Sequence, residues 1–189
     1  SDAVRLFILS DSPPEKDVQW SDQGMMASYK FIQKFWVLHK KIALKSQQQK
    51  ESQIFNKSIE EFTNQIINKI NVSLNKFSYN VIVANFHEIY AFFNKTLEAD
   101  IFNKNFLVNY VKVLTMMLPI TPHLASECLE EITPEKHYYW PEINNKYLES
   151  DQCKIVIQIN GKKRGLILME KNIKEIDLIE KVKKIKEIE

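Results

Sequence analysis

Glycine, proline and long apolar runs are scarce in this 189-residue sequence. Three glycines and six prolines supply few of the tight turns that an all-β protein needs, so the composition favours helices. No apolar run approaches the ~20 residues that a membrane-spanning helix requires, and the sequence does not begin with a signal peptide. Because the chain starts at Ser1-Asp2, inside what we expect to be a structured element, we interpret it as a fragment of a longer protein.

Cysteine and arginine are equally scarce. Cys128 and Cys153 fit neither a metal-binding spacing nor a disulfide framework, which is typical of a reducing, cytoplasmic setting. Nearly all the positive charge is lysine, since Arg5 and Arg164 are the only arginines. The formal net charge is only +2, so any nucleic-acid footprint must be local. Lysine binds phosphate as a point charge, whereas bidentate base reading favours arginine, so we expect contacts with an RNA backbone.

Most of the sequence has the periodicity of amphipathic helices, with apolar residues at steps of three and four. Two adjacent prolines, Pro13-Pro14, must end the opening apolar run at residues 4–9. A first helix is then expected at residues 22–45, followed by a connector at residues 46–50 that has no apolar residue. The predicted core-facing stripe of this helix consists of Met25, Tyr29, Ile32 and Trp36.

Four further helices are predicted. Their apolar stripes are Phe55, Ile59, Phe62, Ile66 and Ile70; Ile82, Phe86, Ile89 and Phe93; Phe106, Tyr110, Val113 and Met117; and Leu124, Cys128 and Ile132. The helix near residues 103–118 has the widest apolar arc, so we expect it to lie centrally. The face opposite the first of these stripes carries Glu60, Asn64 and Lys69. Short connections favour antiparallel neighbours, so the predicted fold class is mainly α, an antiparallel helix bundle.

A small, incomplete α+β piece is predicted after the bundle. Two stretches, Lys154–Ile159 and Arg164–Met169, alternate as strands do and flank Asn160-Gly161, the strongest short hairpin signal. A last helix is expected from Asn172, and a lone hairpin and helix barely close a core. The predicted domains are a connector at 1–21, the bundle at 22–141, a polar linker at 142–153 and a truncated α+β domain at 154–189.

Three ordered strings carry a resemblance to a known family. They are Ser12-Pro13-Pro14-Glu15-Lys16-Asp17 followed by Trp20-Ser21-Asp22, then Leu118-Pro119-Ile120-Thr121-Pro122-His123, and then Asn160-Gly161-Lys162-Lys163-Arg164-Gly165. Together they resemble bacterial leucyl-tRNA synthetases, which are class Ia aminoacyl-tRNA synthetases, over the anticodon-binding helical domain and the start of the C-terminal domain. Leu129 stands where the family usually has tryptophan. The family's ATP-binding HIGH and KMSKS motifs are absent from this sequence.

The resemblance implies a part of a leucine–tRNA ligase, an enzyme that uses ATP with magnesium to attach leucine to its tRNA. The fragment would orient the leucine-accepting tRNA and would have no catalytic activity and no cofactor of its own. We expect a cytoplasmic monomer that binds neither DNA nor a membrane. Two alternatives remain open: a helical protein–protein interaction module, and the matching domain of a valyl- or isoleucyl-type synthetase.

Two basic clusters are the candidate tRNA-binding sites. The first lies at the predicted hairpin tip and consists of Lys162, Lys163 and Arg164. Its alternative role is to protect an exposed strand edge by charge. The second lies on the first helix, beside Lys40, and consists of Lys30, Lys34 and Lys41. Its alternative is an ordinary solvated face. Aromatic side chains such as Tyr29 and Trp36 could stack on bases, but their helical spacing favours core packing.

No constellation in the sequence indicates catalysis or a metal site. His123, Glu127 and Cys128 lie within two helical turns, but their spacings of four and five match no recognised metal-binding set. Two adjacent pairs, His87-Glu88 and Glu130-Glu131, are interpreted as solvated helix faces. The three glycines are scattered, so they form no phosphate-binding loop. We therefore predict no catalytic residue and no metal ligand.

Overall fold

The computed structural model describes residues 1–11, 13, 15–48, 56–133, 137–148, 152–159 and 162–170. The chain divides into two compact units, Ser1–Tyr147 and Leu148–Glu189. The division falls inside the predicted linker. The first unit is a bundle of helices and the second contains a β-hairpin, so the predicted mainly α fold class is confirmed.

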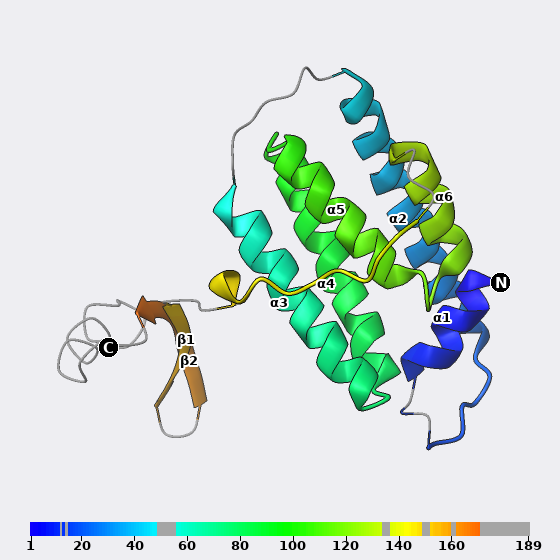
Figure 1. The fold of residues 1–189 in the computed structure, drawn as a ribbon. Helices are drawn as coiled ribbons and strands as arrows, with labels where there is room; N and C mark the ends of the chain where they lie inside the picture. The colour runs from blue at the N-terminus through cyan, green and yellow to red at the C-terminus, as the bar shows by residue number, and fades with distance from the viewer. Residues whose placement is uncertain are drawn as a thin grey trace. The chain divides into compact units, whose positions relative to one another are not determined.

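The described part of the first unit contains six α-helices. They are α1 (Asp2–Asp11), α2 (Asp22–Gln48), α3 (Lys57–Asn75), α4 (Tyr79–Glu98), α5 (Lys104–Met117) and α6 (Pro122–Ile132). As Figure 1 shows, α3, α4 and α5 lie side by side, α6 packs on α2 and α5, and α1 contacts α2, α4 and α6. A segment ending in the 3₁₀ helix η1 (Asn145–Tyr147) then crosses back over the bundle to α3 (Figure 1).

The stripes predicted for the last four helices face the core. Ile66 of α3 and Phe86 of α4 are fully buried, and α5 packs against α3, α4 and α6, as its wide apolar arc predicts. The ring centroid of Phe93 lies 5.1 Å from that of Phe106 and 5.3 Å from that of Tyr110. Burying one such side chain contributes about 1.5–3 kcal/mol relative to leaving it exposed. Packing of these faces therefore holds the bundle together.

In contrast, α2 buries a different face from the one predicted. Tyr29 is 49% exposed, and Ile32 and Trp36 are only half-buried. The buried apolar row instead consists of Phe31, Phe35, Leu38 and Ile42. Both rows recur at helical spacing, so periodicity could not determine which of them faces the bundle. The predicted core packing is wrong for Tyr29 and holds only in part for Ile32 and Trp36.

The boundary between α2 and α3 also differs from the expected one. The helix continues to Gln48, and the Ser46 hydroxyl donates a hydrogen bond to the Ala43 carbonyl at 2.7 Å. The prediction that a connector begins at residue 46 is therefore wrong. Phe55, predicted to open the next stripe, lies outside the described residues. The first turn of α3 is capped by Asn56, whose side chain accepts a hydrogen bond from the Ser58 amide.

The predicted connector at 1–21 contains α1, which is packed into the bundle. Phe7 is buried in this contact. The Arg5 guanidinium donates from Nε to the Ile120 carbonyl at 3.0 Å and from Nη2 to the Pro119 carbonyl at 2.7 Å. These bonds satisfy two carbonyl groups of the turn between α5 and α6. They also fix α1 against the corner between α5 and α6.

The second unit contains an antiparallel hairpin of two strands, β1 (Gln152–Ile159) and β2 (Lys162–Glu170). The predicted strand pair is therefore confirmed. The register pairs Ile157 with Gly165 and then Gln158 with Lys163, so Arg164 is the extra residue of a bulge. The predicted turn and the predicted last helix lie outside the described residues.

Candidate nucleic-acid interface

An exposed row of lysines runs along α2. Lys30, Lys34 and Lys41 are all exposed, and their spacings of four and seven residues place them on one face of the helix. Val37, which is 55% exposed, lies on the same face between the second and third lysines. The three charges are separated by about 6 Å and about 10 Å along the helix axis. The structure therefore brings these predicted residues onto one surface, and their binding role stays a prediction.

A hollow of about 270 Å³ opens beside this row, between α2 and α4. It is lined by Lys30, Gln33, Lys34, Val37 and Tyr90. The tyrosine is half-buried, and its ring centroid lies 6.4 Å from that of Phe31 in an edge-on contact. Two ammonium groups, an amide and a fixed ring thus surround one small volume. This combination suits a phosphate together with part of a ribose or base.

His87 of α4 lies next to the same hollow. Its ring centroid is 4.4 Å from that of Phe31. Burial lowers the pKa of His87 below its usual value, and the positive charge of Lys34 lowers it further. The imidazole is therefore neutral near pH 7 and does not add to the charge of the lysine row. Its neighbour Glu88 forms an ion pair with Lys69 at 2.6 Å. His87 and Glu88 therefore do not form an acid–base pair.

Lys40 does not belong to the row. Its Nζ lies 2.6 Å from Glu131 Oε1 and 5.2 Å from the ring centroid of Trp36, on the side of α2 that faces α6. Glu131 also contacts buried His39, with Nε2 at 2.9 Å from Oε2. The hydrogen bond from Lys40 is the main cause that lowers the pKa of Glu131. Glu131 is exposed, as expected for a solvated helix face, and its carboxylate also joins α6 to α2.

The other predicted cluster belongs to the second compact unit. Lys162 and Lys163 open β2, opposite Ile159 and Gln158, and Arg164 occupies the bulge that follows. A binding role for this cluster and its alternative, protection of a strand edge by charge, both stay predictions.

The residues considered for catalysis occupy structural positions. Cys128 is buried, and desolvation raises the pKa of its thiol to about 12, so it is not a nucleophile at neutral pH. His123 Nδ1 lies 2.8 Å from Asp2 Oδ1, which links α6 to α1. Among the described residues, no group of three or more His, Cys, Asp and Glu side chains could hold a metal ion. In the same residues, no helix is long and apolar enough to cross a membrane.

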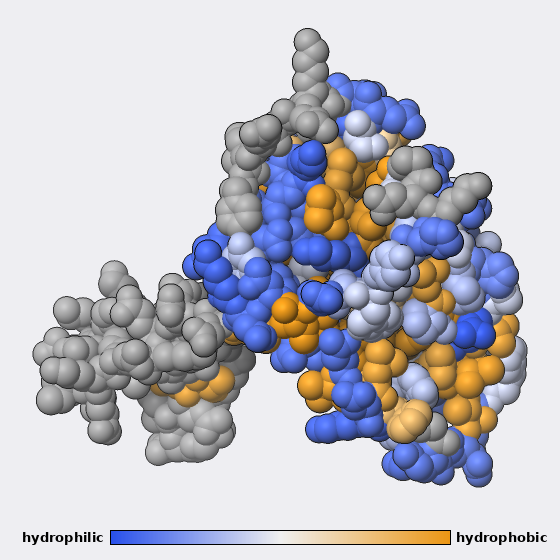
Figure 2. Space-filling view, in the orientation of Figure 1, coloured by the Kyte–Doolittle hydropathy of each residue, from blue (hydrophilic) through white to orange (hydrophobic). Residues whose placement is uncertain are grey.

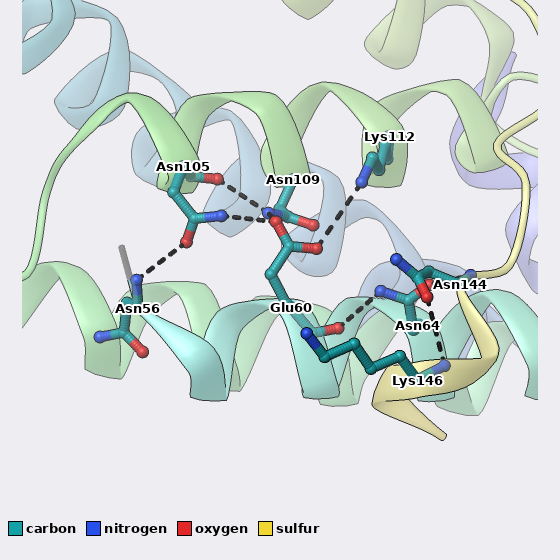
Figure 3. A network of polar contacts seen from close by, with 8 residues as sticks. All are labelled: Asn56, Glu60, Asn64, Asn105, Asn109, Lys112, Asn144 and Lys146. Atoms are coloured by element: carbon teal, nitrogen blue, oxygen red, sulfur yellow. Dashed lines mark hydrogen bonds and ion pairs between the residues drawn. The ribbon is translucent and has the colours of Figure 1, made fainter. Parts of the chain in front are cut away.

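Sequence reasoning missed a buried polar network on α3. Figure 3 shows Glu60 between two asparagines of α5: its Oε1 accepts hydrogen bonds from Asn105 Nδ2 at 2.5 Å and from Asn109 Nδ2 at 2.8 Å. One turn further along α3, buried Asn64 accepts a hydrogen bond from the Asn144 amide at 2.7 Å. Two of the three residues predicted to lie opposite the core, Glu60 and Asn64, are therefore covered by α5 and by the segment before η1, while the third, Lys69, is exposed. Asn105 and Asn109, four residues apart on α5, were the feature of the sequence that could have indicated this network.

The sequence resembles parts of longer proteins. A family described as the anticodon-binding domain of tRNA ligase matches residues 56–187. The leucine–tRNA ligases of Petrotoga mobilis, Wolbachia pipientis and Thermotoga maritima are 30%, 30% and 29% identical over 190, 185 and 191 residues. These alignments cover 93%, 94% and 94% of this chain, and 23%, 22% and 23% of the relatives. The chain therefore spans less than a quarter of the length of these relatives.

The fold is also found in a solved structure. The chain matches the agnB2 LeuRS of Agrobacterium radiobacter K84, crystallised as a ternary complex with tRNA and LeuAMS, with a TM-score of 0.73 and 20% sequence identity. The match covers 99% of this chain and 25% of that chain. At this level of identity the likeness is one of fold.

Proposed function

Because the chain belongs to the family of anticodon-binding domains of tRNA ligases, we propose that it is the tRNA-binding part of a leucine–tRNA ligase. The relatives that support leucine as the amino acid align over more than nine tenths of the chain. In this role the bundle grips and orients tRNA, while activation of leucine and its transfer to the tRNA take place elsewhere in the ligase. A monomeric, cytoplasmic enzyme that binds RNA and not DNA is part of the proposal.

The observation that carries the proposal is the lysine row beside the hollow between α2 and α4. Lys30 and Lys34 line the hollow and Lys41 continues the row, while Tyr90 supplies a ring at its wall. When these lysines bind phosphates of the tRNA, the counterions of those phosphates are released. This release would provide most of the binding free energy. Because lysine does not read bases in a bidentate way, the row positions the tRNA backbone and does not select the sequence.

ATP and magnesium do not fit the residues of this chain. The sequence has neither HIGH nor KMSKS, and its three glycines form no phosphate-binding loop. In the part of the chain that the structure describes, no group of three or more His, Cys, Asp and Glu side chains could hold a metal ion. In the proposed ligase these ligands would therefore be bound by parts outside this chain, and no step of the reaction is assigned to its residues.

Replacing Lys30, Lys34 and Lys41 with alanine in the complete ligase is expected to weaken tRNA binding. Each lost phosphate contact lowers the magnitude of the log–log salt slope by about 0.7–0.9, so the triple variant should lose roughly two to three in slope. The measurement is tRNA affinity across a salt series. Because all three side chains are exposed, the thermal midpoint of the variant should stay close to that of the wild type.

The matched control removes the same charge from other surfaces of the bundle. Its substitutions are Lys69→Ala, Lys76→Ala and Lys95→Ala, all at exposed positions. We expect this control to keep the slope within about one of the wild-type value. An equal loss of slope in both variants would show that general charge, and not the α2 row, binds the tRNA. A tRNA affinity without salt dependence would instead favour the protein–protein interaction module.

A separate triple substitution tests the hairpin cluster. Changing Lys162, Lys163 and Arg164 to alanine in the complete ligase should also lower the slope by roughly two to three, if each side chain makes one phosphate contact. The same salt series with the same tRNA gives the result. An unchanged slope, together with aggregation of the variant, would show that these charges only guard the exposed edge of β2.

A further inference from the structure

An apolar groove of about 620 Å³ lies on the bundle next to the hollow beside the lysine row, and Gln33 lines both. It is formed by the start of α1, the middle of α2 and the start of α6. Its lining residues are Ser1, Asp2, Ala3, Tyr29, Ile32, Gln33, Trp36, His123, Leu124 and Glu127. Figure 2 shows apolar residues at the surface over the part of the view where α1 lies in Figure 1. We call this volume the α1–α2–α6 groove.

The floor of the groove is the row of α2 that the sequence pattern assigns to a core. Tyr29, Ile32 and Trp36 follow one another at helical spacing, as residues do on a packed helix face. The tyrosine is nevertheless 49% exposed. A contiguous apolar patch that is concave and rimmed by polar residues is typical of an interaction surface. The described residues thus leave partly uncovered a face whose composition is that of a packed one.

The walls of the groove are held in place by hydrogen bonds. Asp2, which is 6% exposed, accepts a bond from the Leu124 amide at 2.7 Å through Oδ2 and contacts His123 Nδ1 at 2.8 Å through Oδ1. Ser1 Oγ lies 3.0 Å from the same imidazole nitrogen. A carboxylate at the first free amides of a helix is favoured by the helix dipole. The start of α1 is therefore fixed to the start of α6, and the groove is preformed.

Charge argues against RNA as the occupant. The described lining residues include two carboxylates, Asp2 and Glu127, and no lysine or arginine. An RNA strand would bring phosphates towards these carboxylates, whereas the lysine row lies around the helix on the side of α4. An apolar protein segment fits the groove better, because it can bury the exposed rings without placing charge against charge.

We infer that this groove is an interface inside the proposed ligase, covered by the portion of the ligase that joins the chain at Ser1. Three of the lining residues, Ser1, Asp2 and Ala3, are the first of the chain, so any portion attached there emerges at the groove itself. The relatives are more than four times as long as the segment they share with this chain, which leaves a large portion to supply the contact. The inference rests on the proposed function, because it needs the longer enzyme.

Oxidative footprinting of aromatic side chains tests this inference without any activity assay. Tyr29 should react at least fivefold more slowly in the complete ligase than in the 189-residue chain. Tyr139, which is 87% exposed, is the reference that corrects for the overall dose. Equal reactivity of Tyr29 in both proteins would overturn the inference. So would protection of Tyr29 only after tRNA is added, or protection in the 189-residue chain that appears only at concentrations where it dimerises.

A matched pair of substitutions provides the second measurement. Tyr29→Glu places a charge in the groove, and Val108→Glu places one on α5 at a site that is 46% exposed. In the 189-residue chain both variants should unfold within about 2 °C of the wild type, since both sites face solvent. In the complete ligase only Tyr29→Glu should lower the thermal midpoint, by roughly 4 °C or more. Identical midpoints for the two ligase variants would contradict the inference.

The outcomes separate this inference from the proposed function. If tRNA binding by the complete enzyme does not depend on the lysine row but Tyr29 is protected, the groove is an interface in a protein with another role. If the salt series behaves as expected and Tyr29 stays reactive, the chain binds tRNA and the groove has a different purpose. Each measurement therefore fails independently of the other.

Discussion

Phe86→Asp is expected to unfold the helical bundle. Phe86 is fully buried on α4 within the main hydrophobic cluster. Removing a large core side chain costs about 3–5 kcal/mol, and an unpaired carboxylate in its place adds several kcal/mol more unless it becomes protonated. The sum is comparable to the whole free energy of unfolding of a typical domain, about 5–15 kcal/mol. Urea unfolding followed by far-ultraviolet circular dichroism measures the effect.

The control is Lys69→Asp on α3, which also introduces an aspartate. Lys69 is exposed and forms a surface ion pair with Glu88 at 2.6 Å, with both side chains 49% exposed. Replacing this pair by two carboxylates should lower the free energy of unfolding by only about 1 kcal/mol, because solvent screens exposed charges. Similar losses in the two variants would mean that the buried face of α4 has been wrongly assigned.

Glu60→Ala is expected to lower the free energy of unfolding by about 2–3 kcal/mol. The Glu60 carboxylate accepts hydrogen bonds from Asn105 and Asn109 of α5, and its second oxygen lies 3.8 Å from Lys112 Nζ (Figure 3). Its side chain is only 13% exposed, so water cannot fully replace it as an acceptor. Asn109 is fully buried and would keep a single bond from its amide, to the Asn105 carbonyl. Chemical denaturation of the chain gives the free energy directly.

Glu61→Ala is the matched control, one residue along the same helix. Glu61 pairs with Lys57 at 3.0 Å across one helical turn, and the lysine is 67% exposed. Pairs of this kind contribute about 0.3–0.5 kcal/mol, so Glu61→Ala should be several times milder than Glu60→Ala. If the two variants were equally stable, the Glu60 network would contribute no more than a surface ion pair. Restoration of stability by Glu60→Gln would show that the lost hydrogen bonds, and not the charge, caused the loss.

The lysine row could be chosen from the sequence only in part. Lys30, Lys34 and Lys41 are recognisable as a strip by helical spacing, but Lys40 is adjacent to Lys41 and equally basic. Helical geometry places Lys40 about 100° around the helix from Lys41, and its ion pair with Glu131 of α6 holds it on that side of α2. The tyrosine that completes the hollow comes from α4, two helices further along the chain than the lysines. No local pattern links residues so far apart, since only packing places them together.

The sequence by itself determined helices α2 to α6, the hairpin and the core faces of α3 to α6, because these depend on local propensity and on one apolar row per helix. Where a helix has two rows of residues that could each be buried, the tertiary structure decided which of them is covered. On α2 the row with Phe31 and Phe35 became the core, and the row with Tyr29 stayed at the surface. On α3 the polar residue Glu60 was covered as well, because α5 brought two asparagine amides to its carboxylate. Which row is covered depends on the neighbours that pack against it, and periodicity along one helix carries no information about them.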